Sequence, residues 1–218
     1  MPIDTGSARK ITKLEVQKNN AHRANVYLDG EFALGVHQDL ILEFGLHKGC
    51  TLSVEDQQKL EAADAVMKAK DVALEYLAHK QRTEQELRTR LASESYLQSV
   101  IEAVVDRIDE LGYLDDEQYA HDYVRGRFSN RRFGPFRIRQ ELRERGVDER
   151  FIDQALEELS QEAVRDAARY HAQKKWKQMP DSESYLKRKR KAKGYLRRRG
   201  FGFQLIRSVL DEVTDESR

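Results

Sequence analysis

The sequence contains a single cysteine, only 3 prolines and only 12 glycines among its 218 residues. The lone Cys50 excludes an intramolecular disulfide and any site that needs two thiolates, and it is typical of a protein from a reducing compartment. So few helix-breaking residues argue against a sandwich or barrel of many short strands. Because Leu, Ala, Glu, Gln, Lys and Arg are abundant instead, the composition predicts a mainly α-helical protein.

Long hydrophobic runs are also missing. The N-terminal residues MPIDTGSARK lack the apolar stretch of a signal peptide, and no segment reaches the length needed to cross a bilayer. Charged residues make up 35% of the chain against 39% hydrophobic ones, a balance that suits thin helical layers with much solvated surface. We therefore expect a cytoplasmic protein that makes no contact with membranes.

Residues with catalytic or metal-binding chemistry form no recognisable site. No two of the six histidines are four positions apart, and the sequence has no cluster of cysteines that could complete a set of metal ligands. Both observations argue against a transition-metal site. Gly30 and Gly35 have the first spacing of a phosphate-binding loop, but Val36 stands where that loop needs lysine. Asp115 and Asp116 lie at the start of an expected helix, where carboxylates cap the helix. We expect neither an enzyme nor a bound metal or cofactor.

The second half of the chain contains an internal repeat. Residues 141–159 align without a gap on residues 195–213, at a lag of 54. A further copy begins near Leu87 and aligns with the second copy at a lag of 51 residues. In each copy the apolar residues have helical spacing before and after a central turn. The positions that match between the second and third copies are Leu142 with Leu196, Gly146 with Gly200, Val147 with Phe201, Ile152 with Ile206, Leu156 with Leu210, and Leu159 with Val213.

A further helix precedes each helical hairpin, so each repeat has three helices. The three preceding helices are expected over residues 57–80, 116–130 and 161–178. Thr83 with Glu86 predicts a capping box, Pro135 a first helical turn, and Gly112, Gly146 and Gly200 predict helix ends. The predicted domains are a first repeat over 53–114, a second over 115–159 and a third over 160–218. Because such small units stack on their neighbours, we expect an elongated, curved array.

The first fifty residues have a different pattern. Apolar and polar residues alternate from Leu14 to Val36, and the pair Asp29 and Gly30 predicts a hairpin turn. We expect a small three-stranded antiparallel β meander that packs on the first helix, followed by a short helix over residues 37–44. Ser53 and Asp56 then cap the helix that opens the first repeat. Residues 1–52 therefore form a separate N-terminal domain in this prediction.

Positive charge is concentrated in the second and third repeats, although the net charge is only +1. Residues 125–150 contain nine arginines against four acids, and residues 169–200 contain thirteen lysines or arginines against two acids. The alignment places Arg137, Arg139, Arg143 and Arg145 opposite Lys191, Lys193, Arg197 and Arg199. The first repeat has Glu86, Arg88, Ala92 and Glu94 at these places. This basic row occurs in the second and third repeats and not in the first. It indicates that these two repeats face a polyanion or an acidic protein groove.

Scattered basic residues usually form an ordinary solvated helix face. An unbroken basic run over residues 187–191 is harder to explain in that way, because adjacent like charges repel. We therefore favour binding and name as the residues expected to bind the polyanion or acidic groove Arg131, Arg132, Arg137, Arg139, Arg143, Arg145, Lys187, Arg188, Lys189, Arg190, Lys191, Lys193, Arg197, Arg198 and Arg199.

Four aromatic residues lie beside the basic segments: Phe133, Phe136, Tyr185 and Phe203. Such rings can stack on nucleic-acid bases, although packing between repeats is the more common use of an aromatic residue in this position. Phe133 and Phe136 flank Gly134 and Pro135, and we expect these two rings to be the more exposed.

Three segments resemble the RecX family: GYLDDEQYA over residues 112–120, RRFGPFRIRQELRERGV over 131–147 and TEQELRTRLA over 83–92. The resemblance covers roughly residues 60–214, and the third repeat matches by pattern more than by motif. The resemblance implies a bacterial regulator that binds in the groove of the RecA filament on single-stranded DNA. It further implies that the protein damps the ATPase, co-protease and strand-exchange activities of the filament, and so regulates DNA repair, recombination and the SOS response. We expect the protein to be a monomer, although the sequence alone leaves its oligomeric state open.

Two alternatives make different predictions. A helix-turn-helix protein that uses the hairpin around Gly146 binds a duplex sequence tightly without a recombinase, with an affinity that falls steeply in salt. A structural adaptor for an acidic protein shows no salt-sensitive binding to single-stranded or duplex DNA.

Overall fold

The computed structural model of the chain describes residues 8–215. Positions 1–7, which carry most of the N-terminal segment considered above, lie outside the described residues. The chain divides into two compact units: the first contains Met1–Lys80 and Leu87–Tyr113, and the second contains Gln81–Glu86 and Leu114–Arg218. The predicted mainly helical fold with three three-helix repeats and a small N-terminal antiparallel sheet is confirmed.

The N-terminal sheet has four strands rather than three. Strands β1 (Arg9–Gln17), β2 (Asn20–Leu28) and β3 (Glu31–His37) form the predicted antiparallel meander. A short strand β4 (Thr51–Leu52) pairs antiparallel with β1 and gives the order β3-β2-β1-β4. The sequence does not predict β4, because two residues are too few to show an alternating pattern.

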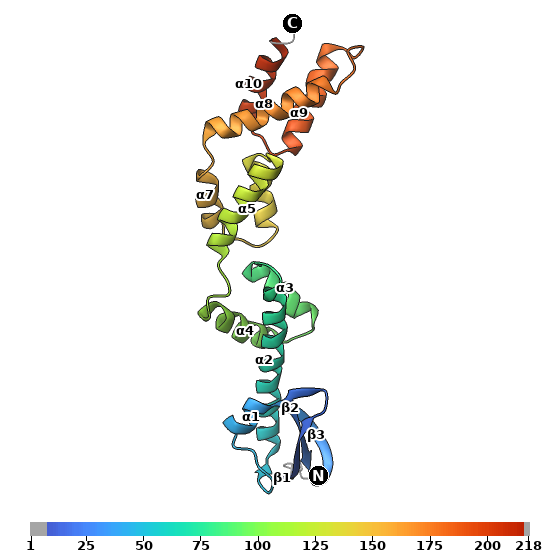
Figure 1. Cartoon of the computed structure of the whole chain (residues 1–218), viewed down its shortest axis with the longest axis vertical. Helices are drawn as coiled ribbons and strands as arrows, with labels where there is room; N and C mark the ends of the chain where they lie inside the picture. The colour runs from blue at the N-terminus through green and yellow to red at the C-terminus, as the bar shows by residue number, and fades with distance from the viewer. Residues whose placement is uncertain (1–7, 216–218) are drawn as a thin grey trace, which may run out of the picture. The chain divides into compact units, whose positions relative to one another are not determined.

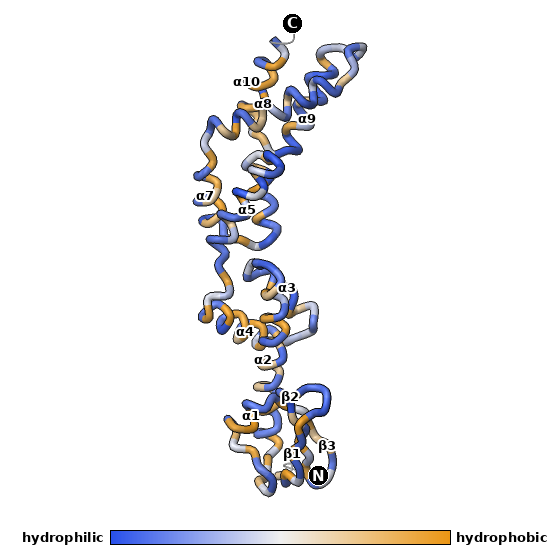
Figure 2. Tube along the Cα trace, viewed as in Figure 1, coloured by the Kyte–Doolittle hydropathy of each residue, from blue (hydrophilic) through white to orange (hydrophobic). Residues whose placement is uncertain are grey.

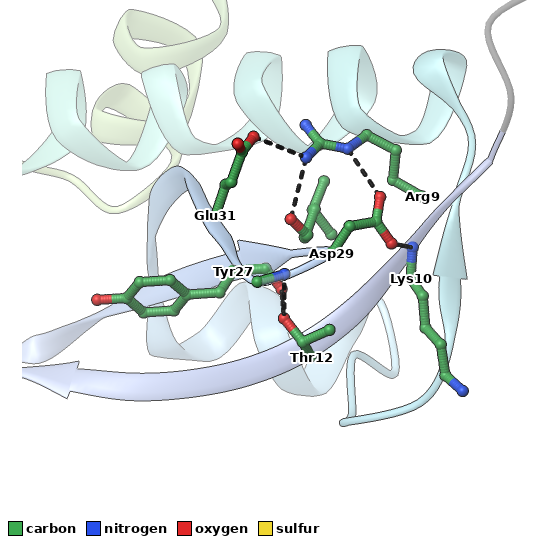
Figure 3. A network of polar contacts seen from close by, with 8 residues as sticks. Arg9, Lys10, Thr12, Tyr27, Asp29 and Glu31 are labelled. Atoms are coloured by element: carbon green, nitrogen blue, oxygen red, sulfur yellow. Dashed lines mark hydrogen bonds and ion pairs between the residues drawn. The ribbon is translucent and has the colours of Figure 1, made fainter.

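The turn between β2 and β3 is held by side chains of β1 (Figure 3). Arg9 Nε donates to Asp29 Oδ2 at 3.0 Å, and the backbone N–H of Lys10 donates to Asp29 Oδ1 at 3.1 Å. Thr12 Oγ1 accepts from the backbone N–H of Gly30 at 2.9 Å. Asp29 and Gly30 both have positive φ angles, of 51° and 91°, as a two-residue hairpin turn requires. The predicted turn is therefore confirmed.

Helix α2 (Val54–Ala78) packs on the sheet and begins at the predicted capping box of Ser53 and Asp56. The short helix α1 (Gln38–Glu43) precedes it, and both lie beside the sheet (Figure 1). Asp64 of α2 is buried and accepts from Arg23 Nη2 at 2.8 Å and from the backbone N–H of His37 at 2.9 Å. Burial raises the pKa of Asp64, but these hydrogen bonds outweigh it, so the pKa lies below the ordinary value.

The first repeat continues with α3 (Glu84–Ser93) and α4 (Gln98–Glu110). The predicted capping box is present at the start of α3, where Thr83 Oγ1 accepts from the backbone N–H of Glu86 at 3.1 Å. Helix α4 packs against α2 and buries an apolar face at the spacing of a helix. The buried residues of this face are Val100, Ile101, Val104, Val105 and Ile108.

The second unit contains the other two repeats. The second repeat consists of α5 (Asp116–Arg131), α6 (Pro135–Arg143) and α7 (Glu149–Glu157), and the third of α8 (Gln161–Lys177), α9 (Tyr185–Arg198) and α10 (Phe203–Asp215). Ile138, Leu142 and Ile152 are fully buried in the core of the second repeat. Their aligned partners Leu196 and Ile206 lie in the core of the third. Each repeat of this unit therefore has its own apolar core.

The second and third repeats are joined by a close backbone contact. The backbone N–H of Gly134 donates to the carbonyl oxygen of Arg199 at 2.8 Å, and that of Phe136 donates to the carbonyl oxygen of Gly200 at 3.1 Å. A Cβ atom on Gly134 would lie 2.3 Å from the carbonyl oxygen of Gly200. A Cβ atom on Gly200 would lie 2.4 Å from the backbone nitrogen of Arg137. We call this contact the glycine junction; it excludes side chains from both positions.

Replacing Gly200 by alanine should destabilise the protein more than the same change at Gly30. Both residues have a φ of +91°, but nothing lies within 4 Å of a Cβ on Gly30. Gly30→Ala should lower the free energy of unfolding by about 1 kcal/mol, from the left-handed backbone alone. Gly200→Ala should cost about 3 kcal/mol or more, because it adds overpacking. Scanning calorimetry of both variants measures the difference, and equal losses would contradict the glycine junction.

Candidate nucleic-acid interface

The predicted basic row of the second repeat is occupied by internal ion pairs. Arg137 Nε lies 2.9 Å from Glu141 Oε1, and Arg143 Nε lies 2.6 Å from Glu149 Oε2. Arg139 pairs with Glu149 and, at 2.5 Å, with Asp153. Arg145 pairs with Glu86. The structure thus balances these four charges with carboxylates of the same unit, and a role for them in binding stays a prediction.

Glu141 is the centre of this pairing on α6. Its carboxylate is half-buried and accepts from Arg127 Nε at 2.6 Å, from Arg137 Nε at 2.9 Å and from the Tyr123 hydroxyl at 3.0 Å. Burial raises the pKa of Glu141, but the three hydrogen bonds outweigh it and hold the pKa below the ordinary value. These arginines are therefore positioned to hold the helices of the second repeat together.

The basic run over residues 187–191 is also largely neutralised. Lys187 and Lys191 both pair with Glu183, the former at 3.8 Å. Arg188 Nη1 lies 3.0 Å from Asp181 Oδ1, and Lys189 Nζ lies 2.7 Å from Asp211 Oδ1. Counting charge along the sequence misses the last of these pairs, because Asp211 comes from α10.

Three cations on one face of α9 pair with no carboxylate of residues 8–215. Arg190, Lys193 and Arg197 follow one another at spacings of three and four residues, so they share a face of the helix, and all three are exposed. We call this row the open stripe. The tube of α9 is correspondingly hydrophilic along most of its length (Figure 2). Arg198 is also exposed, and its carbonyl oxygen accepts from Arg137 Nη1 at 3.4 Å.

A second group of cations lines a cleft of about 400 Å³ between the end of α5, α8 and the end of α9. Carboxylates are missing from its lining. The lining residues are Ser129, Asn130, Arg131, Arg132, Tyr170, His171, Lys174 and Arg199. We call this the basic cleft. It brings together three of the predicted binding residues and adds Lys174, which lies in the preceding helix α8 and so falls outside the basic rows that the repeat alignment marks.

A buried histidine shapes the wall of the basic cleft. Arg132 ends α5 with a positive φ of 49°, which is strained for a side chain of this size. His171 Nε2 lies 3.3 Å from the carbonyl oxygen of Arg131 and 3.1 Å from that of Arg132. Because carbonyl oxygens only accept, Nε2 carries a proton and donates to them. Burial, with Arg199 nearby, lowers the pKa of His171, so the ring is neutral at pH 7.

Aromatic rings support two of the arginines of the cleft. The Arg132 guanidinium lies 4.2 Å from the centroid of the Tyr170 ring, and that of Arg199 lies 5.3 Å from the Phe133 ring. The expectation that Phe133 is exposed is wrong, because only 6% of its surface is accessible and its ring lies in the core of the second repeat. Phe136 and Phe203 are exposed, at 66% and 58%. Tyr185 is partly covered and bonds to Thr214.

Two further kinds of feature, a metal-binding cluster and a membrane-spanning helix, are missing from the described part of the chain. No group of three or more His, Cys, Asp or Glu in residues 8–215 could hold a metal ion. No helix of the same residues is both long and apolar enough to cross a bilayer.

Comparison with protein families identifies all four parts of the chain. Residues 9–53 match the family model described as the regulatory protein RecX N-terminal domain. Residues 69–107, 115–156 and 163–210 match the first, second and third three-helix domains of RecX, respectively. The third repeat, which resembled the family least by motif, is thus matched in its own right.

Individual proteins agree with these matches. The chain is 34% identical over 204 residues to a protein named regulatory protein RecX from Staphylococcus saprophyticus, covering 94% of this chain and 74% of the relative. It is 32% identical to the protein of that name from Clostridium acetobutylicum, covering 95% and 97%. A crystal structure of a regulatory protein RecX superimposes with a TM-score of 0.77 at 30% identity, covering 95% of this chain and 99% of the other.

Replacing Glu141 by glutamine should destabilise the second unit in a pH-dependent way. Because the pKa of Glu141 is lowered in the folded protein, its stabilising effect is present above the ordinary glutamate pKa and is lost as the pH falls through the lowered value. Glu141→Gln should therefore lower the free energy of unfolding by about 1 to 2 kcal/mol at pH 7 and by much less at pH 3. The measurement is urea unfolding at both pH values.

Glu144→Gln is the matched control, since Glu144, at the end of the same helix, is exposed and its carboxylate accepts only from Gln140 within residues 8–215. It should change the stability by less than about 0.5 kcal/mol at either pH. If Glu141→Gln lowered the free energy of unfolding equally at pH 7 and pH 3, the stabilisation by the ionised Glu141 carboxylate would be contradicted.

Proposed function

Because the chain belongs to the RecX family of regulatory proteins, we propose that it regulates the RecA recombinase. In this proposal the protein binds the filament that RecA forms on single-stranded DNA and inhibits its ATPase, co-protease and strand-exchange activities. The protein acts in the cytoplasm as a monomer, without catalysis of its own, and thereby restrains DNA repair, recombination and the SOS response.

The basic cleft is the observation that supports this proposal best. Its four cations, Arg131, Arg132, Lys174 and Arg199, face a concave surface whose lining contains no carboxylate. A nucleic-acid backbone or an acidic protein groove attracts such a surface, and binding releases condensed counterions from the nucleic acid. The arginines of α6 contribute less to this attraction, because they must first give up the ion pairs with Glu141, Glu149 and Glu86.

The alternative of a helix-turn-helix protein is less favoured. In that arrangement α7 would be the recognition helix in the major groove. Helix α7 carries exposed Asp153 and Glu157, and Glu149 at its start is engaged by Arg139 and Arg143. DNA phosphates repel acidic side chains, so this helix is poorly suited to enter a groove.

Removing two cations of the basic cleft should weaken inhibition of the filament. We expect the double variant Arg131→Ala/Lys174→Ala to need about tenfold more protein for half-inhibition of the RecA ATPase on single-stranded DNA, since it loses two charge-assisted contacts. The double variant Arg139→Ala/Arg143→Ala removes the same amount of charge from paired positions. It should shift half-inhibition by less than about threefold.

The ATPase titration separates the parts of the proposal. Failure of the unmodified protein to inhibit the filament would contradict the proposed function itself. Equal shifts in the two double variants would contradict only the assignment of the contact to the basic cleft.

A further inference from the structure

We propose that Phe136 and Phe203 form a platform on which unpaired bases of single-stranded nucleic acid stack, while the open stripe binds the neighbouring phosphates. This inference deepens the proposed function and rests on it for the presence of single-stranded DNA. It concerns an interaction that does not need the recombinase, so it can be tested separately.

Both phenylalanines lie in the second unit, close in sequence to the residues of the glycine junction. Phe136 is the second residue of α6, and its backbone N–H donates to the carbonyl oxygen of Gly200 at 3.1 Å across the glycine junction. A Cβ atom on Gly202 would lie 3.1 Å from Phe136 Cε2, so the Phe136 ring lies against Gly202. Phe203 is the next residue and begins α10. The Phe136 ring thus contacts the residue directly before Phe203, although the two phenylalanines lie in different repeats.

The exposure of this pair is unlike that of their sequence neighbours. Phe133 and Phe201, which stand two or three positions away, are only 6% and 3% exposed and fill the cores of their repeats. Phe136 and Phe203 leave 66% and 58% of their surface in solvent. These two rings contribute little to the cores, so their faces are available to a partner.

The charges beside the rings indicate the partner. Lys193 Nζ lies 4.4 Å from the centroid of the Phe203 ring, and Arg197 follows one helical turn later in the open stripe. Neither cation pairs with a carboxylate within residues 8–215. Planar apolar groups joined by a polyanionic chain match this combination, and single-stranded nucleic acid has both. A duplex covers the faces of its bases, and an acidic peptide lacks regularly spaced planar groups.

The glycine junction makes the platform rigid. Gly134 and Gly200 leave no room for side chains, and the hydrogen bonds from Gly134 and Phe136 tie the start of α6 to the end of α9. The backbone segments that carry the two rings are therefore joined by direct hydrogen bonds. A preformed surface loses little conformational entropy when a ligand binds.

Fluorescence anisotropy with labelled oligodeoxythymidine, in the absence of recombinase, tests the platform. A second oligonucleotide of equal length with abasic sites keeps the phosphates but has no bases. Phe136→Ala and Phe203→Ala should each weaken binding of oligodeoxythymidine by about 5- to 100-fold and binding of the abasic strand by less than about twofold. Leu42→Ala is the control, since Leu42 is 83% exposed but lies on α1 of the first unit. It should change neither affinity.

Lys193→Ala should weaken binding of both oligonucleotides and reduce the slope of log K against log salt concentration by about 0.7. Phe136→Trp should retain the affinity of the unmodified protein for oligodeoxythymidine, because it keeps an aromatic face. Circular dichroism checks that each variant is folded.

The platform would be overturned if the unmodified protein did not bind oligodeoxythymidine, or if it bound a duplex more tightly than the single strand. It would also be overturned if the phenylalanine variants lost equal affinity for both oligonucleotides, or if their affinity for oligodeoxythymidine were unchanged. Inhibition of the filament ATPase that persists despite any of these results would leave the proposed function standing and remove only the platform. Base-dependent binding without inhibition would support the platform and contradict the proposed function.

Discussion

The close approach of two backbones at Gly134 and Gly200 is the constraint on which the binding surface of the second unit depends. A single methyl group at either position would overlap backbone atoms of the opposite repeat. This contact sets the end of α9 beside the segment between α5 and α6. The basic cleft and the two exposed phenylalanines are both built from residues next to it. The backbone contact at the glycine junction can therefore position the cations of the basic cleft, whose lining contains no carboxylate.

Internal neutralisation decides which basic residues are available to a partner. Glu141, Glu149 and Glu183 each engage two basic side chains, so three acids hold six of the basic residues that the sequence concentrates in two repeats. Cations without a carboxylate partner among residues 8–215 include those on one face of α9 and those around the basic cleft. The structure thereby separates arginines that hold helices together from those that can attract a polyanion, a distinction that net charge does not reveal.

Local patterns predicted most of the fold but little of the charge pairing. The capping boxes at Ser53 and Thr83 and the glycines that end α4, α6 and α9 act within a few residues, so their signals are visible in the sequence. The pairs of Lys189 with Asp211 and Arg145 with Glu86 join residues 22 and 59 positions apart, and no periodicity marks them. Phe133 was misplaced because it lies between two helices, where no periodic pattern marks its burial in the core of its own repeat under Arg137.

Lysine modification with and without the RecA filament on single-stranded DNA tests the central claim most directly. If the open cations contact the filament, acetylation of Lys174 and Lys193 is slowed when the filament is present, as mass spectrometry of the digested protein would show. Lys189 and Lys191, which are held by Asp211 and Glu183, are then modified equally in both conditions. Protection of Lys189 and Lys191 with unchanged reactivity of Lys174 and Lys193 would contradict the account.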